Sequence, residues 1–299
     1  MIDTAGVIGV GAMGMGIAES LLRGRFTTFA RDIDPARERV ARTLGAGVAG
    51  SARALGEAAQ AIFVVVVDAG QIDTVLAGDD GLLAALGPGK LVLVCSTIAP
   101  GDAQRFAATI AATGAGVLDA PISGGPARAH AGTMSMMLAG DADLIARARP
   151  MLDAVSARRF VISQRCGDAA KAKLVNNLMA GINLMAGAEA LALAARLGLD
   201  PRQMFDLISA SSGQSWMFED RMARALAGDY APRAAAPVLT KDLTLANEAA
   251  RAAGVELPMG ALARDLLRAT CDGGWSAEDD AAALKYYLKR FDAGDVAGR

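Results

Sequence analysis

The segment AGVIGVGAMGMG, residues 5–16, decides the fold class. It places Gly9, Gly11 and Gly14 directly after a short apolar run and at the start of a helical pattern. In a strand–turn–helix unit the first glycine permits the tight turn, the second lets the backbone approach a pyrophosphate, and the third allows the helix to pack closely on the strand. The helix N-terminus favours the negative charge of the phosphates. The segment therefore predicts a dinucleotide site.

Strand-like and helix-like segments alternate beyond this loop. The run AIFVVVV, residues 61–67, is continuously apolar, as in strands that are buried on both faces of a parallel sheet. Such alternation predicts βαβ units and therefore a doubly wound α/β Rossmann sheet. The expected strands are residues 5–10, 26–30, 61–67, 90–96 and 114–121, with two more at the far edge of the sheet, 133–140 and 158–163.

The pattern changes near residue 165. Downstream of it, apolar residues recur at helical spacing, and loops rich in glycine and proline separate the helical segments. We therefore expect a dinucleotide-binding domain over residues 1–165, a long interdomain helix over 166–196 and an all-α domain over 197–299.

Composition narrows the class of protein. The chain has 299 residues, 53% of them hydrophobic, and a net charge of −2, which argues against disorder and against non-specific nucleic-acid binding. Cys95, Cys166 and Cys271 form no CxxC pair, so we expect buried free thiols and no metal site. The start of the chain lacks a signal-peptide pattern. Residues 178–195 are apolar enough to span a membrane, but they contain Asn183 and Glu189, so a buried helix is favoured over membrane insertion.

An acidic residue follows the second expected strand. Asp32 stands where a carboxylate accepts hydrogen bonds from the adenosine ribose of NAD, and it would repel the 2′-phosphate of NADP. Arg31 is adjacent and could bind that phosphate, so NADP stays possible. The alternative interpretation makes Asp32 only the cap of the next helix.

Two further segments carry polar groups in patterns that suit a site. In SGG, the Ser123 hydroxyl precedes the amides of Gly124 and Gly125, which suits a carboxylate, although a plain turn has the same pattern. In KAKLVNN, Lys173 and Asn177 are four residues apart and therefore share one helix face.

Neighbouring polar residues are expected to do less. Lys171 is rotated by about 200° from Lys173 on a helix and should be solvated. Asn176 should hydrogen-bond locally. Asp242 is expected at a helix start, where an acid can simply favour the helix N-terminus. His130 is expected to be exposed or at a helix end rather than catalytic.

Together the glycine loop, DAPISGGPARA, GDAAKAKLVNN and KDLTLA resemble the β-hydroxyacid dehydrogenase family, which includes relatives of 3-hydroxyisobutyrate dehydrogenase and tartronate semialdehyde reductase. The resemblance covers nearly the whole chain, with the motifs in the family's order. It implies a cytoplasmic homodimer or homotetramer, assembled through the helical domain, that oxidises the hydroxyl of a small β-hydroxy acid with a nicotinamide cofactor. One departure is Ala169, which stands where the family often has glycine.

The resemblance also implies roles for residues. Lys173 would be the acid/base, with a pKa lowered by desolvation, and Asn177 would orient it or the substrate. Ser123, Gly124 and Gly125 would hold the substrate carboxylate. The expected cofactor-binding residues are Gly9, Gly11, Ala12, Met13, Gly14, Arg31, Asp32, Val67, Thr97 and Lys241.

The substrate is less constrained. The segment SSGQSWMFEDR suggests a branch with L-threonate dehydrogenase-like and D-phenylserine dehydrogenase-like members, and Trp216 either lines the substrate pocket or packs a loop. An imine reductase-like NADPH enzyme is disfavoured because such relatives usually lack the lysine. A non-catalytic dinucleotide-binding module would predict loss of the lysine or the serine loop. A 6-phosphogluconate dehydrogenase-like enzyme would need a longer helical part.

Overall fold

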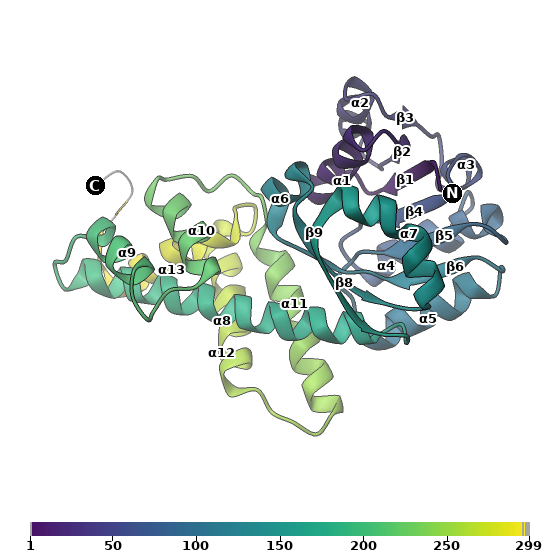
Figure 1. Cartoon of the computed structure of the whole chain (residues 1–299). Coiled ribbons are helices and arrows are strands. Elements are labelled where there is room, and N and C mark those ends of the chain that lie inside the picture. The colour runs from purple at the N-terminus through teal and green to yellow at the C-terminus, as the bar shows by residue number, and fades with distance from the viewer. Residues whose placement is uncertain (1, 295, 297–299) are drawn as a thin grey trace. The chain divides into compact units, whose positions relative to one another are not determined.

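The structure, a computed structural model, describes residues 2–294 and 296. The chain forms two compact units, of which the first ends at Lys173 and the second begins at Leu174. Both are drawn in Figure 1. The division falls inside one helix, α8 (Asp168–Arg196), whereas the sequence suggested boundaries at the two ends of that helix.

The first unit is built on one sheet. Within the described residues it has nine strands in the order β3-β2-β1-β4-β5-β6-β8-β7, and β9 pairs with β8. The strands from β3 to β6 are parallel, β8 runs antiparallel to β6 and β7, and β9 is parallel to β8. Strand bounds are β1 Thr4–Ile8, β2 Thr27–Arg31, β3 Gly47–Val48, β4 Ala61–Val64, β5 Leu91–Val94, β6 Gly116–Asp119, β7 Ile122–Ser123, β8 Met134–Ala139 and β9 Ser156–Ser163.

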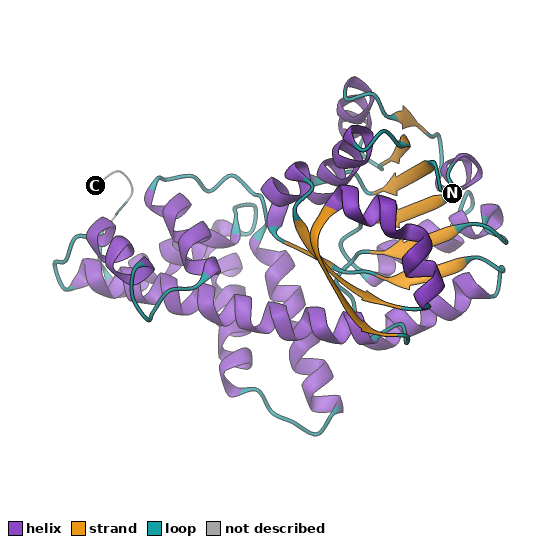
Figure 2. Ribbon diagram, viewed as in Figure 1, coloured by secondary structure: helices purple, strands orange, loops and turns teal. Residues whose placement is uncertain are grey.

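Helices flank the sheet, as Figure 2 shows. Alternation of side chains along the strands produces two apolar cores, one on each face: Phe63 packs in one, while its neighbours Ile62 and Val64 pack in the other. The doubly wound fold expected from the sequence is therefore confirmed. The helical elements of this unit are α1 Ala12–Arg23, α2 Pro35–Thr43, α3 Ala52–Ala58, α4 Ala69–Ala77, η1 Leu82–Ala85, α5 Pro100–Ala111, α6 Gly125–Ala131 and α7 Ala142–Val155.

The strand predictions were right in place and less accurate in length. The apolar run at 61–67 leaves the sheet after Val64, because the adjacent strand β1 ends at Ile8. The Ile8 carbonyl accepts the last hydrogen bond between the two strands, from the Val65 amide at 2.8 Å. The two-residue strands β3 and β7 were not expected, since two residues carry no periodicity.

The second unit is helical, as expected. Its core is formed by apolar side chains of several helices, among them Leu184, Leu191, Phe218 and Tyr287. A buried ion-pair network ties two segments together, with Arg221 bound to Asp280 at 2.6 Å. After α8, the helical elements are α9 Pro201–Ser209, α10 Trp216–Leu226, α11 Ala236–Ala252, α12 Pro258–Thr270, the π-helical η2 Cys271–Trp275, η3 Asp280–Ala282 and α13 Ala283–Phe291.

Among the described residues, one helix, α8, is long and apolar enough to cross a membrane by length and composition alone. Core helices of soluble proteins often meet the same criterion. The side chains of Leu184 and Leu191 on this helix are buried in the core of the second unit.

Candidate functional site

The glycine loop between β1 and α1 forms a cradle that only glycine can build. Gly9 has φ +88°, and a Cβ on it would lie 2.4 Å from the Val65 carbonyl oxygen. A Cβ on Gly14 would lie 1.9 Å from the Gly9 carbonyl oxygen, so α1 packs directly on the turn. The loop precedes the N-terminus of a helix of 12 residues, whose first two are Ala12 and Met13. This geometry fits the pyrophosphate of a dinucleotide.

An arginine that the sequence interpretation missed lies beside this loop. A guanidinium nitrogen of Arg37 is 3.2 Å from where a Cβ on Gly11 would lie, and 3.8 Å from Asp32 Oδ2. Its only sequence signal was a position in the first turn of α2, two residues after Pro35. Arg37 therefore joins the residues that border the dinucleotide cradle.

Asp32 and Arg31 differ in what they are free to bind. The Asp32 side chain is buried at the end of β2, and its Oδ1 accepts a hydrogen bond from the Asp34 amide at 2.9 Å. The cap of α2 is Asp34 rather than Asp32, so the alternative interpretation of Asp32 as that cap was wrong. Arg31 forms an ion pair with Glu38 at 2.6 Å.

The carboxyl ends of the parallel strands form one edge of the sheet, next to the switch of strand order between β1 and β4. Ligands bind at such an edge in doubly wound folds. Thr97 and Ser96 follow β5 there, and Ser96 Oγ accepts a hydrogen bond from the Val66 amide at 3.2 Å. Val67 is about half exposed, and its amide donates to the Gln71 side chain.

The serine–glycine segment begins on β7 and ends in α6. Ser123 is half-buried on the strand, and Gly124 and Gly125 follow with φ values of +129° and +72°, which strain any other residue. A Cβ on Gly124 would lie 2.7 Å from Arg128 Cδ. The two glycines therefore turn the chain sharply and leave their amides close to the serine.

Asp119 fixes the start of α8 to the sheet. This buried carboxylate ends β6 and accepts hydrogen bonds from the amides of Gly167 at 2.7 Å and Ala170 at 3.0 Å. Burial raises the pKa of Asp119, and these backbone donors oppose the shift. Ala169, which stands where the family often has glycine, is fully buried against Met137 and Ala139 of β8. Packing therefore requires a small side chain at this position.

Lys173 lies near the start of α8 and is 7% exposed, and Asn177 lies one turn later at 8%. Asn176 Nδ2 donates to Asn177 Oδ1 at 2.9 Å, as expected of a local role. Asn177 Nδ2 in turn donates to Asp242 Oδ2 at 2.6 Å. Lys171 is exposed and bound to Asp168. The lysine and the asparagine expected at a site are thus the buried polar members of the segment, and the amide plane of Asn177 is fixed by partners on both sides.

Asp242 is placed differently from the expectation. Helix α11 begins at Ala236, so Asp242 lies in its second turn and is buried rather than an acid of the helix start. Pro237, a residue common in first turns, belongs to this helix and not to the preceding loop, so the helix begins before Lys241. The Asp242 carboxylate joins Asn177 to Lys241, whose Nζ lies 2.8 Å from Oδ1.

Trp216 is the first residue of α10 and is 40% exposed, with Ser215 as the helix cap. Its neighbours Met217 and Phe218 are buried in the core of the second unit, so they pack rather than line a pocket. His130 is exposed and contacts Glu19, in agreement with a non-catalytic role.

The cysteines are free, but only Cys95 is buried; Cys166 and Cys271 are half-buried, which corrects the expectation that all three are buried. Burial strongly raises the pKa of the Cys95 thiol. Among the described residues there is no group of three or more side chains that could hold a metal ion.

Comparison with known families matches both units. Residues 4–166 match the NAD-binding domain of 6-phosphogluconate dehydrogenase, and residues 167–287 match the NAD-binding family of NADP-dependent 3-hydroxyisobutyrate dehydrogenase. The two matches meet at the start of α8 and together cover nearly all of the chain.

Individual relatives match over almost their full length. L-threonate dehydrogenase of Cupriavidus necator is 40% identical over 96% of this chain and 97% of its own. NAD-dependent L-serine dehydrogenase of Pseudomonas aeruginosa is 34% identical over 94% of this chain and 96% of its own. The crystal structure of a 3-hydroxyisobutyrate dehydrogenase from Salmonella typhimurium superposes with a TM-score of 0.89 at 38% identity, covering 94% of this chain and 99% of that chain.

Proposed function

The chain belongs to the β-hydroxyacid dehydrogenase family, the nicotinamide-dependent enzymes related to 3-hydroxyisobutyrate dehydrogenase, and on that premise we propose that its substrate is a small polar β-hydroxy acid of the L-threonate type. The single observation that carries the proposal is the buried pair Lys173 and Asn177 on α8, with Asn177 held by Asp242. A buried amine beside an oriented amide suits proton transfer at an alcohol. Identity to an L-threonate dehydrogenase supports the choice of substrate.

The roles of the residues follow from their chemistry. In alcohol oxidation the neutral amine of Lys173 takes the hydroxyl proton and becomes an ammonium, and it returns a proton in the reverse reaction. A bound nicotinamide dinucleotide supplies the hydride acceptor. One N–H of Asn177 is used by Asp242, so its other N–H is directed at the substrate. Ser123 and the amides of Gly124 and Gly125 bind the carboxylate.

NAD is the preferred cofactor in this proposal. Asp32 is buried directly after β2, where its carboxylate would accept hydrogen bonds from the adenosine ribose, and a 2′-phosphate there would meet a carboxylate. The Arg31 side chain is paired with Glu38, whereas the Arg37 guanidinium lies beside Gly11 of the glycine loop. Thr97 and Lys241 are assigned to the nicotinamide end.

Homo-oligomerisation and a cytoplasmic location complete the proposal. Helices of the second unit expose large apolar side chains, and contact with a second copy of the chain would bury them. These side chains include Val175, Met179, Leu193, Met259 and Leu262. Sedimentation of the purified chain tests the assembly state, and a monomer at micromolar concentration would contradict it.

The substrate test is NADH formation with L-threonate, L-serine, 3-hydroxyisobutyrate and phenylserine, each with NAD and with NADP. Among these four monocarboxylic acids we expect the highest kcat/KM with L-threonate, and with NAD as the cofactor. The variant Lys173→Met keeps the apolar volume and removes the amine, so its kcat/KM should fall by about 10²–10⁴-fold, the range that general acid–base catalysis contributes.

A matched control lies in the same segment. Lys171→Met removes an exposed lysine of the same helix and should keep full activity. Equal losses in the two variants would mean that Lys173 is not the base. Tight NADH binding without turnover of any acid would favour a non-catalytic module, and activity on cyclic imines with NADPH would favour the imine reductase alternative.

A further inference from the structure

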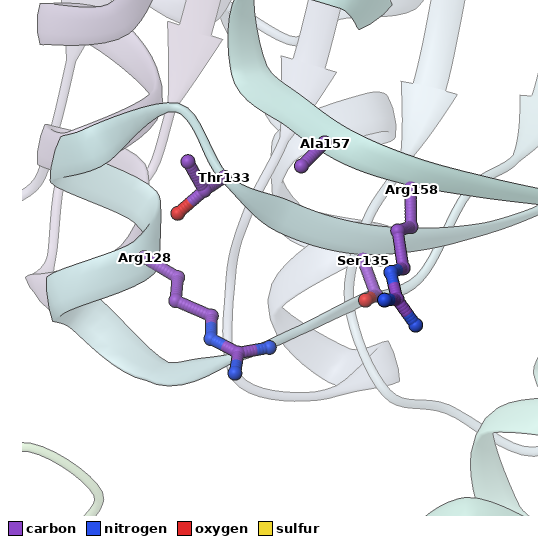
Figure 3. Close-up of a pocket in the computed structure, with 5 residues that line it drawn as sticks. All are labelled: Arg128, Thr133, Ser135, Ala157 and Arg158. Carbon is purple, nitrogen blue, oxygen red and sulfur yellow. The ribbon is translucent and has the colours of Figure 1, made fainter.

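A pocket of about 430 Å³ lies on the first unit beside the serine–glycine segment. Five residues line it, and Figure 3 shows them: Arg128, Thr133, Ser135, Ala157 and Arg158. Among these described lining residues two are cationic, two carry hydroxyls and none is acidic. The pocket therefore has positive charge at its ends and hydroxyls that can donate hydrogen bonds between them, which is the chemistry that recognises an anion.

Strand register connects this pocket to the expected carboxylate seat. Ser123 on β7 pairs with Ser135 on β8, and Ser135 pairs with Arg158 on β9. Directly paired residues on neighbouring strands point to the same face, with Cβ atoms about 5 Å apart. The three side chains therefore form one row across the sheet, beginning at Ser123 and ending at a guanidinium.

The row lies on the face of the sheet that packs against the start of α8, the helix that carries Lys173. Met137 is two residues beyond Ser135, so the two side chains share a face of β8. Met137 packs against Ala169 and Ala172 in the first turn of α8, next to Lys173.

Two features bring the arginines to the row. A register shift between Met134 and Ser135 makes Ala157 an extra residue in β9, and both Ala157 and Arg158 line the pocket. From the other side, Arg128 reaches across Gly124, where a Cβ would meet its side chain at 2.7 Å. In Figure 3 Arg128 extends from helix α6 and Arg158 from strand β9, on opposite sides of the pocket.

We propose that Arg128, Ser135 and Arg158 form a second anion subsite, which selects hydroxy acids carrying a further carboxylate or phosphate beyond the carboxylate held by Ser123. The inference rests on the proposed function, because it assumes that Ser123 binds the first carboxylate. It identifies the preferred substrates as dianionic β-hydroxy acids, while monoanionic acids of the same length are turned over with lower kcat/KM.

The test compares matched substrates. One pair is 2-(hydroxymethyl)glutarate and its neutral distal amide, which have the same shape and differ in one charge; the other is 4-phospho-L-threonate and L-threonate. We expect the member with the second anionic group in at least one pair to have a kcat/KM at least tenfold higher, and which pair does so distinguishes carboxylate from phosphate. Arg158→Gln and Arg128→Gln should each abolish the preference, mainly through KM, by lowering the kcat/KM of that member to the value of its monoanionic counterpart.

A control variant and a second measurement separate this inference from the proposed function. Arg149→Gln on α7 removes an exposed arginine outside the pocket and should keep the preference. Equal kcat/KM within both pairs in the native protein would overturn the subsite and leave the proposed function intact. If no acid is turned over, the proposed function fails, and the subsite is then decided by inorganic phosphate: it must raise the Tm of the native protein but not that of Arg158→Gln, and no shift overturns it.

Discussion

Replacing Asp242 with alanine should impair catalysis without impairing cofactor binding. The carboxylate is 4% exposed and accepts the Asn177 amide at 2.6 Å. Without it, an N–H of Asn177 is buried and unpaired, which costs about 1–3 kcal/mol. Asn177 can escape this cost only by rotating its amide away from the orientation set by Asn176 and Asp242.

The loss of orientation sets the size of the effect. At about 1.4 kcal/mol for each factor of ten, the cost corresponds to a drop of roughly 5- to 150-fold in kcat/KM. The Asp242→Asn variant keeps an acceptor oxygen and loses only the ion pair with Lys241, whose side chain is partly exposed. Such pairs contribute about 0–1 kcal/mol, so we expect at most a roughly fivefold loss.

The assay is steady-state NADH formation with the best acid substrate, with NADH affinity and Tm measured on the same samples. Asp242 acts through Asn177 and is a positioning residue, so the loss should fall on kcat while NADH affinity changes little. Asp265→Ala, an exposed acid on α12, is the control and should behave as the native protein. Asp242 does not position Asn177 in this way if Asp242→Ala keeps kcat/KM within twofold of the native protein, or if Asp242→Asn loses as much as Asp242→Ala.

Three further outcomes follow from other parts of the chain. Gly14→Ala should abolish NADH binding in fluorescence titrations, because its Cβ would lie 1.9 Å from the Gly9 carbonyl oxygen. Hydrogen bonds from Lys171 and Ser163 lower the pKa of Asp168 to about 2, below its ordinary 3.8. The contribution of the carboxylate to stability is therefore present above pH 3.8 and is lost as the pH falls through about 2. In Asp168→Asn the Tm should depend less on pH over that range. Cys95 should resist alkylation at pH 8 in the folded protein, as read by peptide mass mapping, because burial raises its pKa.

The fold could be predicted from the sequence wherever segments were long enough to show a period. The parallel strands β4 and β5 carry continuous apolar runs, and both faces of the sheet bury them. The two-residue strands were not predictable, because β3 and β7 owe their conformation to neighbouring strands rather than to their own residues. The end of β4 at Val64 likewise depends on where β1 ends.

The candidate site was predictable where a motif has local geometry. Lys173 and Asn177 follow from a helical spacing of four, and the glycine loop from its turn. Asp242 was missed in this role because it is far in sequence from Asn177, and Arg37 was missed because no local pattern places its side chain beside Gly11. Only the tertiary structure joins Asp242 to Asn177, which is 65 residues away.

One continuous helix, α8, carries both Lys173 and Asn177, and it therefore fixes the distance between them. Four residues of α-helix separate the two by about 6 Å of rise, and substitutions elsewhere in the chain leave this spacing unchanged. Asp119 anchors the helix before the lysine, and Asp242 holds the asparagine after it. Loops on either side of the helix can therefore change in sequence to fit other hydroxy acids, while the spacing between Lys173 and Asn177 stays the same. This makes the fold well suited to laboratory evolution of substrate range.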